Sequence, residues 1–560
     1  MKKLALFLAF FCALAGAQTF PVQNLTVGGT SSFTGTMSGA GLTNYLASPP
    51  AIGSSAANTG SFTTLATSGT HTASGASVLN GTVSGTGLST YEANINHVQT
   101  VLNIAALRAL NCVSGLVYSA QGYYTLGDGG GGALYVCNSG DTSTADNGGT
   151  ILAAANTFRL YMMPPSQYNA RQFGMKCDGA TDDTTALQAA VTASVGHSLY
   201  IPAGTKGNGA PFNQNPCLIS APITLTSTVG GYNIFGDSPE WSTANGNSGG
   251  TIIKNTSVTG TDAFQVTSAA NGQVLISKFA ILGNGSDGNG ITLSGAFNTI
   301  IEKMTIAGVG KAGVSATNSF NSHVYQSLIG NLKQDGILWN GLANGISIRD
   351  NVFFNCDTAH GGYGEIRITG TGGNSLAPVV EGNTFEGGAN TEFGLILTGT
   401  NGATVKGNYF EVIPTLLYSD TTVSGFSYDS NYFQDGLVTI AGSTNGAFTN
   451  NVVAKNTITT TATITTSTGG NNVFAHGNVA TGGATISIPA SSGTATLVAG
   501  TATVSNLNVN SGIPIMISRA TAAGTVGDLR LGTVTNGSSF TINSASSTDT
   551  STVNGSFGGY

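Results

Sequence analysis

The chain has 560 residues, of which 81 are glycine, and only 8% of them are charged, against about a quarter in an average globular protein. Its formal net charge is −7, which argues against a nucleic-acid partner because such partners require a basic patch. Abundant threonine, serine, asparagine, valine and isoleucine favour strands and turns. We therefore expect a mostly β protein of several domains, whose uncharged polar groups suit sugars.

The amino-terminal segment MKKLALFLAFFCALAGA places two lysines before an apolar run that ends in small residues. This pattern predicts a secretory signal peptide over residues 1–17, with a buried helix as the alternative. No later stretch is apolar and long enough to cross a membrane. An odd number of cysteines remains after cleavage, without a C-x-x-C spacing, so zinc is not expected and the disulfide pairing stays open: Cys112, Cys137, Cys177, Cys217 and Cys356.

Two segments before residue 165 differ in pattern. In residues 18–96, GTMSGAGLTNY (35–45) recurs as GTVSGTGLSTY (81–91), which predicts a fibrous adaptor. Residues 48–70, SPPAIGSSAANTGSFTTLATSGT, resemble the amino-terminal parts of phage tail fibres and tail spikes. Residues 97–165 contain IAALRAL and QGYYTLGDGGGGALYVCNSGDTSTADNGGT and resemble the head domain of such tail spikes. The glycine run lacks the lysine of a phosphate loop and predicts a turn between strands.

Three aspartates stand close together in CDGATDDTTALQAA, residues 177–190. Asp182 or Asp183 can accept hydrogen bonds from the first amides of a helix that begins near Thr184. A calcium loop is excluded because no glutamate stands at its last ligand position. Residues 169–204 resemble the opening of the pectate-lyase-like β-helix superfamily, so we expect this helix to cap a solenoid.

Residues 274–479 contain an apolar repeat at spacings of 20 to 32 residues, from VLISKFAI (274–281) to NVFAHGNV (472–479). A period in this range without helical periodicity predicts a solenoid with one coil per repeat. Asparagines that share one register predict a hydrogen-bonded ladder along the axis: Asn351, Asn383, Asn408, Asn431 and Asn451. The sequence thus predicts a parallel β-helix over residues 166–490, and the resemblance implies that it is right-handed.

Alternating apolar positions of the repeat predict which side chains point inward. The first inward column is Ile276, Ile301, Val324, Ile348, Val380, Val405, Tyr428 and Phe448. The second is Ile281, Ile306, Ile329, Phe353, Phe385, Phe410, Phe433 and Val453. A further strand in each coil places inward Ile291, Ile337, Ile366, Leu395 and Leu437, with Trp339 also in the core.

Two outward columns are candidates for chemistry. One contains Glu302, Tyr325, Arg349, Glu381, Lys406 and Asp429, which could bind sugar or form a ladder of ion pairs. The other contains Phe354, Glu386, Glu411 and Gln434, with Asp435 beside it. Adjacent glutamates raise the pKa of one partner, as glycosidases require, although two solvated glutamates at a turn also fit the pattern.

One coil carries the insertion NCDTAHGGYGEIR, residues 355–367. Long loops on a regular scaffold concentrate binding function, and this one holds Asp357, His360, Tyr363, Glu365 and Arg367. A polar surface loop explains these residues nearly as well.

The carboxy-terminal residues 491–560 alternate polar and apolar positions and resemble the small β-sandwich-like module that ends many phage tail proteins. The chain as a whole resembles a phage tail spike or tail fibre with a pectate-lyase-like right-handed parallel β-helix. This resemblance implies a homotrimer in the virion tail that binds bacterial capsule or lipopolysaccharide. The signal segment instead favours a secreted protein of prophage descent.

Hydrolysis of the bound polysaccharide is the first functional hypothesis, with a polysaccharide lyase or a non-enzymatic adhesin as alternatives. The candidate catalytic residues are Glu386, Glu411, Asp357 and Glu381. The candidate binding residues are Arg349, Arg367, Lys406, His360, Tyr363 and Asp435. In the lyase alternative, His360 or Tyr363 is the base and Arg349, Arg367 or Lys406 neutralises a uronate carboxylate. Neither a metal ion nor a cofactor is expected.

Overall fold

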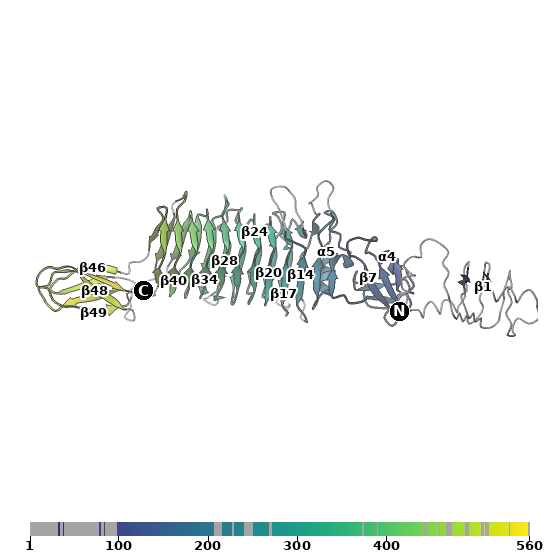
Figure 1. Ribbon diagram of the computed structural model, residues 1–560, viewed down its shortest axis with the longest axis horizontal. Helices are drawn as coiled ribbons and strands as arrows, with labels where there is room; N and C mark the ends of the chain where they lie inside the picture. The colour runs from purple at the N-terminus through teal and green to yellow at the C-terminus, as the bar shows by residue number, and fades with distance from the viewer. Residues whose placement is uncertain are drawn as a thin grey trace, which may run out of the picture.

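The computed structural model describes residues 98–557 and four two-residue strands before them. Short gaps within this range are residues 206–214, 227–228, 240–249, 268–271, 372–374, 389, 442–444, 459, 466–472, 488–491, 506–508, 510–513 and 537. A small β-sheet unit, a long stack of coils and a second small β unit follow one another along the chain (Figure 1). No helix in the described part of the chain is long and apolar enough to span a membrane.

The four early strands belong to the two copies of the internal repeat. They are β1 (Ser32–Phe33), β2 (Met37–Ser38), β3 (Val78–Leu79) and β4 (Val83–Ser84). Strand β1 pairs with β4 and β2 pairs with β3, both antiparallel. The two copies therefore pair with each other.

The head unit is a five-stranded sheet in the order β5-β6-β7-β9-β8 with one short helix. Its elements are β5 (Gln99–Val101), α4 (Ile104–Arg108), β6 (Val117–Ala120), β7 (Ala133–Asn138), β8 (Ile151–Ala153) and β9 (Arg159–Met162). A disulfide joins Cys112 to Cys137. The glycine run lies between β6 and β7, as predicted, and Asp128 closes it by accepting hydrogen bonds from the amides of Tyr123 and Gly131.

The stack of coils is a parallel β-helix made of three sheets of 12, 11 and 11 strands. The first sheet holds β10 (Gln167–Asn169), β11 (Ser198–Ile201), β14 (Tyr232–Gly236), β17 (Val274–Ser277), β20 (Thr299–Glu302), β23 (His323–Tyr325), β26 (Ser347–Arg349), β30 (Val379–Glu381), β34 (Thr404–Lys406), β37 (Ser427–Asp429), β40 (Gly446–Thr449) and β43 (Val473–His476). The second sheet holds β12 (Cys217–Ile219), β15 (Ile252–Asn255), β18 (Ala280–Leu282), β21 (Thr305–Ala307), β24 (Leu328–Gly330), β27 (Val352–Phe354), β31 (Thr384–Glu386), β35 (Tyr409–Glu411), β38 (Tyr432–Gln434), β41 (Val452–Ala454) and β44 (Val479–Thr481). The third sheet holds β13 (Ile223–Leu225), β16 (Phe264–Thr267), β19 (Ile291–Ser294), β22 (Val314–Thr317), β25 (Ile337–Gly341), β28 (Gly364–Gly370), β32 (Phe393–Thr398), β36 (Thr415–Ser419), β39 (Leu437–Ala441), β42 (Thr461–Thr465) and β45 (Thr485–Ser487). Two short strands, β29 (Ser375–Leu376) and β33 (Thr400–Asn401), form a small separate sheet.

Each repeated segment folds into two strands with a sharp bend between them. The residue at the bend has a positive φ, as in Asp350 (56°) and Ser430 (56°), and glycine takes this place at Gly382 and Gly407. Left-handed backbone is accessible mainly to glycine and to residues such as asparagine and aspartate. The bend turns the chain from the first sheet into the second, so the two inward columns belong to different sheets.

The asparagine ladder predicted from the repeat is present directly after this bend. The Nδ2 atom of Asn383 donates to the Oδ1 atom of Asn408 (3.0 Å) and to the carbonyl oxygen of Ile348 (2.9 Å). The backbone amide of Asn383 also donates to Oδ1 of Asn408 (2.9 Å). The same bonds continue from Asn351 to Asn451 and extend one coil further, to Asn478.

The interior follows the two predicted inward columns, whose members are all buried. Phenylalanine rings stack along the axis, with centroids 5.4 Å apart for Phe353 and Phe385 and 4.2 Å for Phe385 and Phe410. The prediction for Leu437 is wrong, because this side chain is 49% exposed and Val438 points inward instead. The cause is a shift in register between β36 and β39, where Thr415 faces Leu437 but Leu417 faces Val438.

The helix predicted after the aspartates, α5 (Thr184–Ala193), lies at the start of the β-helix (Figure 1), where it contacts β13 and the 3-10 helix η1 (Ala170–Phe173). Its apolar face buries Leu187, Ala190 and Val191. Asp182 accepts a hydrogen bond from the amide of Thr184 (2.9 Å), as expected of a capping residue. Asp183 does not cap the helix but accepts from the amides of Lys176 (2.7 Å) and Cys177 (2.9 Å).

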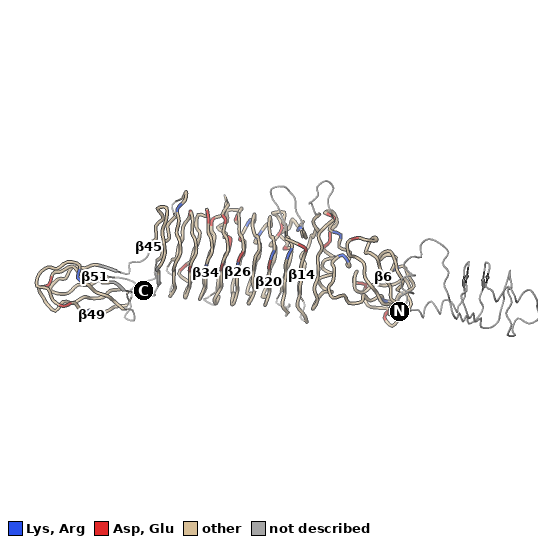
Figure 2. Tube along the Cα trace, in the orientation of Figure 1, with Lys and Arg blue, Asp and Glu red and all other residues tan. Residues whose placement is uncertain are grey.

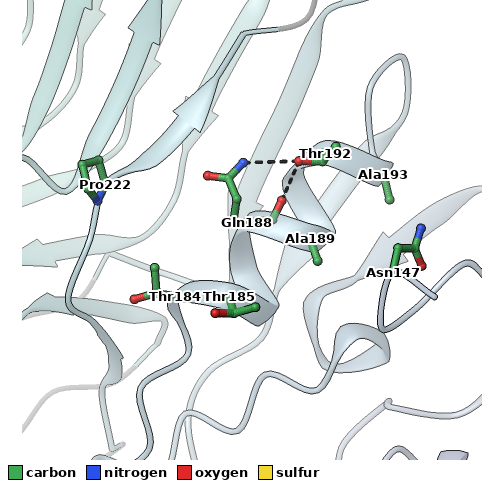
Figure 3. A pocket seen from close by; sticks show the side chains of 8 residues that line it. All are labelled: Asn147, Thr184, Thr185, Gln188, Ala189, Thr192, Ala193 and Pro222. Carbon is green, nitrogen blue, oxygen red and sulfur yellow. Dashed lines mark hydrogen bonds between the residues drawn. The ribbon is translucent and has the colours of Figure 1, made fainter. Parts of the chain in front are cut away.

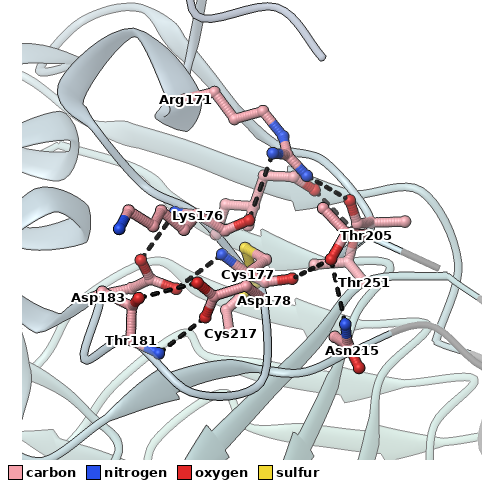
Figure 4. The surroundings of a disulfide bond; sticks show 12 residues. Arg171, Lys176, Cys177, Asp178, Thr181, Asp183, Thr205, Asn215, Cys217 and Thr251 are labelled. Carbon is pink, nitrogen blue, oxygen red and sulfur yellow. Dashed lines mark hydrogen bonds between the residues drawn. A yellow bond between two sulfur atoms is a disulfide. The ribbon is translucent and has the colours of Figure 1, made fainter. Parts of the chain in front are cut away.

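A second disulfide, Cys177–Cys217, ties this capping region to the first coil (Figure 4). The carboxylate of Asp183 lies within 4.8 Å of both sulfur atoms. Sulfurs joined in a disulfide offer no thiolate, so this group is not suited to bind zinc. Asp178 accepts hydrogen bonds from the amides of Ala180 and Thr181. The side chains of Asp178, Asp182 and Asp183 therefore all accept hydrogen bonds from backbone amides.

The carboxy-terminal unit packs two antiparallel three-stranded sheets against each other, in agreement with the predicted β-sandwich-like module. One sheet holds β46 (Ser492–Thr496), β51 (Thr552–Phe557) and β48 (Ile515–Thr521), and the other β47 (Thr501–Ser505), β50 (Ser539–Ser544) and β49 (Leu529–Thr535). Its own small core includes Leu497, Phe540, Ile542 and Val553.

We expect Asn408→Ala to lower the free energy of unfolding by roughly 1–3 kcal/mol, because buried ladder partners on both sides lose their hydrogen bonds. Asn340→Ala is the matched control, since Asn340 is exposed on β25. Thermal and denaturant unfolding of both variants check this prediction, and equal stability of the two would contradict it.

Candidate functional site

The outward column of glutamates lies at the ends of neighbouring strands of the second sheet. Phe354, Glu386, Glu411 and Gln434 are the last residues of β27, β31, β35 and β38, and they face one another in parallel register. Charged residues are sparse on the β-helix and gather on some of its coils (Figure 2). Two carboxyl groups of like charge in register on adjacent strands are therefore a distinct feature of this surface.

Glu411 is held by two hydrogen-bond donors. The hydroxyl of Tyr409 donates to its Oε2 atom (2.6 Å), and the Nε2 atom of Gln434 donates to its Oε1 atom (3.2 Å). The hydrogen bond to Glu411 raises the pKa of Tyr409 to about 12. Glu386, in contrast, is exposed, and within the described residues its carboxyl group has no hydrogen-bond partner.

Residues two apart in a strand point to the same face, which accounts for the contact between Tyr409 and Glu411. The sequence reasoning did not include Tyr409 in the site. The signal was present, because Tyr409 and Tyr432 occupy the same place in successive repeats and stack with centroids 5.4 Å apart.

The other outward column has the predicted register on the first sheet, from Glu302 to Asp429. Arg349 and Glu381 form an ion pair with a nitrogen to oxygen distance of 3.4 Å. Lys406 is exposed and stands between Glu381 and Asp429. The ion pair favours a ladder of paired charges over a sugar-binding column. Lys406 is the cation of this column that remains open to a ligand.

The insertion is anchored from beneath by buried acids. Asp357 is fully buried and accepts hydrogen bonds from the amides of Gly361 (2.8 Å) and Tyr363 (3.1 Å). The prediction of Asp357 as a catalytic residue is therefore wrong, because its carboxylate is buried and both oxygens accept hydrogen bonds from the loop. His360 is exposed at the tip of the loop.

Arg367 is also occupied within the protein. Its Nε atom donates to Oδ1 of Asp335 (2.9 Å), and its guanidinium lies 5.6 Å from the ring centroid of Tyr363. The hydroxyl of Tyr363 accepts a hydrogen bond from Gln334 (3.3 Å). Asp335 was not found from the sequence, because it lies in a turn of the preceding coil.

Asp435 was expected to bind substrate beside the glutamates, but it is 1% exposed. It accepts hydrogen bonds from the amides of Asn456 (2.8 Å), Thr457 (2.9 Å) and Ile458 (2.9 Å). Asp435 therefore holds the turn of the next coil, and this prediction is wrong.

A groove of about 600 Å³ lies beside the capping helix α5 (Figure 3). Its lining residues are Asn147, Thr184, Thr185, Gln188, Ala189, Thr192, Ala193 and Pro222. None of these side chains ionises near neutral pH, so the groove lacks an acid, a base or a nucleophile of the usual kind. The candidate site is therefore the glutamate column with the adjoining loop, and not this groove.

Comparison with known proteins gives two domain matches. Residues 100–162 match the family model of the phage tail protein small four-stranded β-sheet domain, and residues 489–554 match that of the C-terminal domain of K1 capsule-specific polysaccharide lyase. A curated relative, the capsule K30/K69-specific depolymerase 1 of Klebsiella phage K5-2, is 42% identical over 57 residues. That match covers 10% of this chain and only 6% of the relative.

Solved structures with similarity to the chain include two tailspike proteins. The protein of Acinetobacter baumannii phage AM24 is 16% identical, with a TM-score of 0.48, over 81% of this chain and 92% of that chain. Tailspike gp49 of Acinetobacter baumannii phage Fri1, a capsular polysaccharide depolymerase, is 15% identical, with a TM-score of 0.39, over 82% of this chain and 98% of that chain.

The two family matches lie on either side of the β-helix that carries the candidate site. One covers the head sheet, from β5 to β9, and the other covers most of the carboxy-terminal unit. The chain therefore carries a phage tail protein β-sheet domain before its β-helix and a domain similar to the C-terminal domain of a capsule lyase after it.

Proposed function

We propose that this protein is a phage tail spike that binds a bacterial surface polysaccharide and depolymerises it by glycoside hydrolysis, with Glu386 and Glu411 as the reacting carboxyl groups. The observation that supports this proposal is the pair of outward glutamates in register on adjacent strands, in two different environments. Glycosidases need one carboxyl group that gives a proton and one that is ionised. The name of the curated relative, a capsule depolymerase, agrees with this substrate class.

In this proposal Glu411 is the base or nucleophile, because Tyr409 and Gln434 hold its carboxylate. Glu386 is the acid, because its carboxyl group is exposed beside Glu411, where it can reach a bound glycan. It gives its proton to the glycosidic oxygen as the bond breaks. Lys406 and His360 are the exposed groups suited to bind the glycan, and Glu381 paired with Arg349 borders the site on the first sheet.

A polysaccharide lyase is the second candidate, because residues 489–554 match a domain of a capsule lyase. His360 or Tyr363 would then remove the proton next to a uronate carboxylate, and Lys406 would neutralise that carboxylate, or Arg349 once released from Glu381. Arg367 fits this role less well, since Asp335 already holds it.

The same proposal includes the wider setting of the protein. Residues 18–96 form the adaptor, 97–165 the head, 166–490 the β-helix and 491–560 the carboxy-terminal module of a homotrimer in the virion tail. A trimer gives avidity for a repetitive glycan. The signal segment and the two disulfides, Cys112–Cys137 and Cys177–Cys217, support the alternative setting, a secreted protein in an oxidising compartment.

Export predicts that the purified protein begins at Gln18 and that a disulfide-linked peptide contains Cys177 and Cys217. Peptide mapping without reductant, after blocking of free thiols, measures both features. Retention of Met1, or alkylation of Cys177 and Cys217 in the native host, would contradict export.

Glu411→Gln is expected to lower the pKa of Tyr409 towards its ordinary value of about 10, because the hydrogen bond to a carboxylate is lost. Titration of carbon-13-labelled tyrosine followed by nuclear magnetic resonance measures this shift. Glu302→Gln is the control, as Glu302 lies in the other column. An unchanged Tyr409 pKa in Glu411→Gln would show that Glu411 is not held as an anion.

Glu386→Gln and Glu411→Gln should each slow cleavage of a susceptible glycan by about a hundredfold or more. A panel of capsular and lipopolysaccharide glycans provides the measurement. New reducing ends without the absorbance of an unsaturated uronate indicate hydrolysis, new reducing ends with that absorbance indicate a lyase, and retention without cleavage indicates an adhesin. Wild-type cleavage by both variants would exclude this site, and Glu302→Gln again serves as the control.

A further inference from the structure

Glu365 occupies a place where the neighbouring coils have glycine. Five residues align in the strand register of five successive coils: Ile291, Val314, Ile337, Ile366 and Leu395. The residues that directly precede them in the sequence therefore align as well. These five residues are Gly290, Gly313, Gly336, Glu365 and Gly394. Glu365 is thus the one member of this row with a side chain.

The row points into the interior of the β-helix. A Cβ atom added to Gly336 would lie 2.9 Å from Cδ1 of Phe353 and 3.2 Å from Sγ of Cys356, and one added to Gly394 would lie 3.1 Å from Cδ1 of Phe410. Glu365 accordingly projects towards these core side chains and is 0% exposed. Within the described residues, neither oxygen of its carboxyl group has a hydrogen-bond partner.

An isolated carboxylate without hydrogen bonds is strongly disfavoured in such a place, so the group is held uncharged. Burial raises the pKa of Glu365 well above its usual range, and the charge of Glu386 on β31 raises it further. Asp335 and Asp357 are the other acids of this region, and both act on the buried thiol of Cys356 together with Glu365. The cation beside them, Arg367, is engaged by Asp335.

Glu365 stands at the base of the loop formed by residues 355–363. This loop returns to the third sheet at Gly364, whose amide donates to Oδ1 of Asp335 (2.7 Å). At the other end of the loop, the hydroxyl of Thr391 donates a hydrogen bond to the carbonyl oxygen of Cys356 (2.8 Å). Within the loop, Asp357 and His360 have positive φ angles of 65° and 53°, so surrounding contacts must maintain its closed form.

We propose that Glu365 is a positioning residue: its uncharged carboxyl group keeps the loop 355–363 closed beside Glu386, and its ionisation opens the loop. A negative charge at this base would be unpaired and would act against the charge of Glu386, whose carbonyl oxygen accepts a hydrogen bond from the amide of Asn355 at the start of the loop (3.3 Å). The loop carries His360 and Tyr363, so opening removes them from the candidate site. The effect on a glycan rests on the proposed function, whereas the motion of the loop does not.

The direction of the pH effect follows from the raised pKa. A group whose pKa is higher in the folded than in the unfolded state stabilises the fold below its unfolded pKa, and this contribution is lost as pH rises through the folded pKa. The closed loop should therefore be protected in acid and lose protection in mild alkali.

Hydrogen–deuterium exchange of the full chain at about pH 5 and about pH 9, which brackets the range seen for buried glutamates, tests this inference. Protection factors, corrected for the chemical exchange rate at each pH, report opening of residues 355–363. We expect a loss of roughly tenfold or more in the wild type and little change in Glu365→Gln, which retains the shape of the protonated acid. Glu365→Gly, the residue of the neighbouring coils, should also lack the pH effect if the glutamine variant folds poorly.

Glu302→Gln is the control and should lose protection in the loop as the wild type does. Equal protection of the wild-type loop at both pH values would overturn the inference, as would a pH effect that persists in Glu365→Gln or Glu365→Gly. If the loop responds as expected but no glycan is cleaved, the proposed function fails while the role of Glu365 in the loop stands.

Discussion

Hydrogen bonds between stacked coils are the constraint on which the rest of this protein depends. Each coil repeats the one before it in register, and the asparagine ladder fixes the bend between the first and second sheets. Because side chains alternate in direction along a strand, this fixed bend decides which residues face the core and which face solvent. Glu386 and Glu411 stand in register on the surface because Phe385 and Phe410, the residues before them, stack in the core.

The candidate site combines one regular part with one irregular part. The glutamate column belongs to the regular coils, where a rigid scaffold sets the spacing of the carboxyl groups. The loop 355–363 interrupts that regularity. Two buried acids, Asp357 in the loop and Asp335 in the preceding coil, accept hydrogen bonds from its backbone amides and from that of Gly364. A rigid platform beside a loop with its own anchor is a common arrangement for binding an extended ligand.

Much of the fold could be predicted from the sequence because a solenoid is locally periodic. The repeat period and the residue types are enough to predict that Ile348, Val380 and Asn383 point inward, since equivalent positions in each coil have the same surroundings. The same reasoning failed where one coil differs from its neighbours. Leu437 follows a register shift between β36 and β39. Asp435 and Asp357 lie in turns, and they are buried because residues that follow in the chain fold over them. Glu365 stands where a glycine is expected, and only the register between strands shows that it points inward.

The position occupied by the ladder asparagines changes character along the β-helix. In earlier coils Phe279, Met304 and Ser327 stand there, each after a residue with positive φ, and from Asn351 onward the amides take over. An apolar side chain at this bend must fit the shape of the side chains above and below it. An asparagine instead offers the same hydrogen-bond donor and acceptor in every coil. Coils in the asparagine part therefore share one contact at the bend that repeats along the axis, whereas each earlier coil packs a different side chain at the same bend.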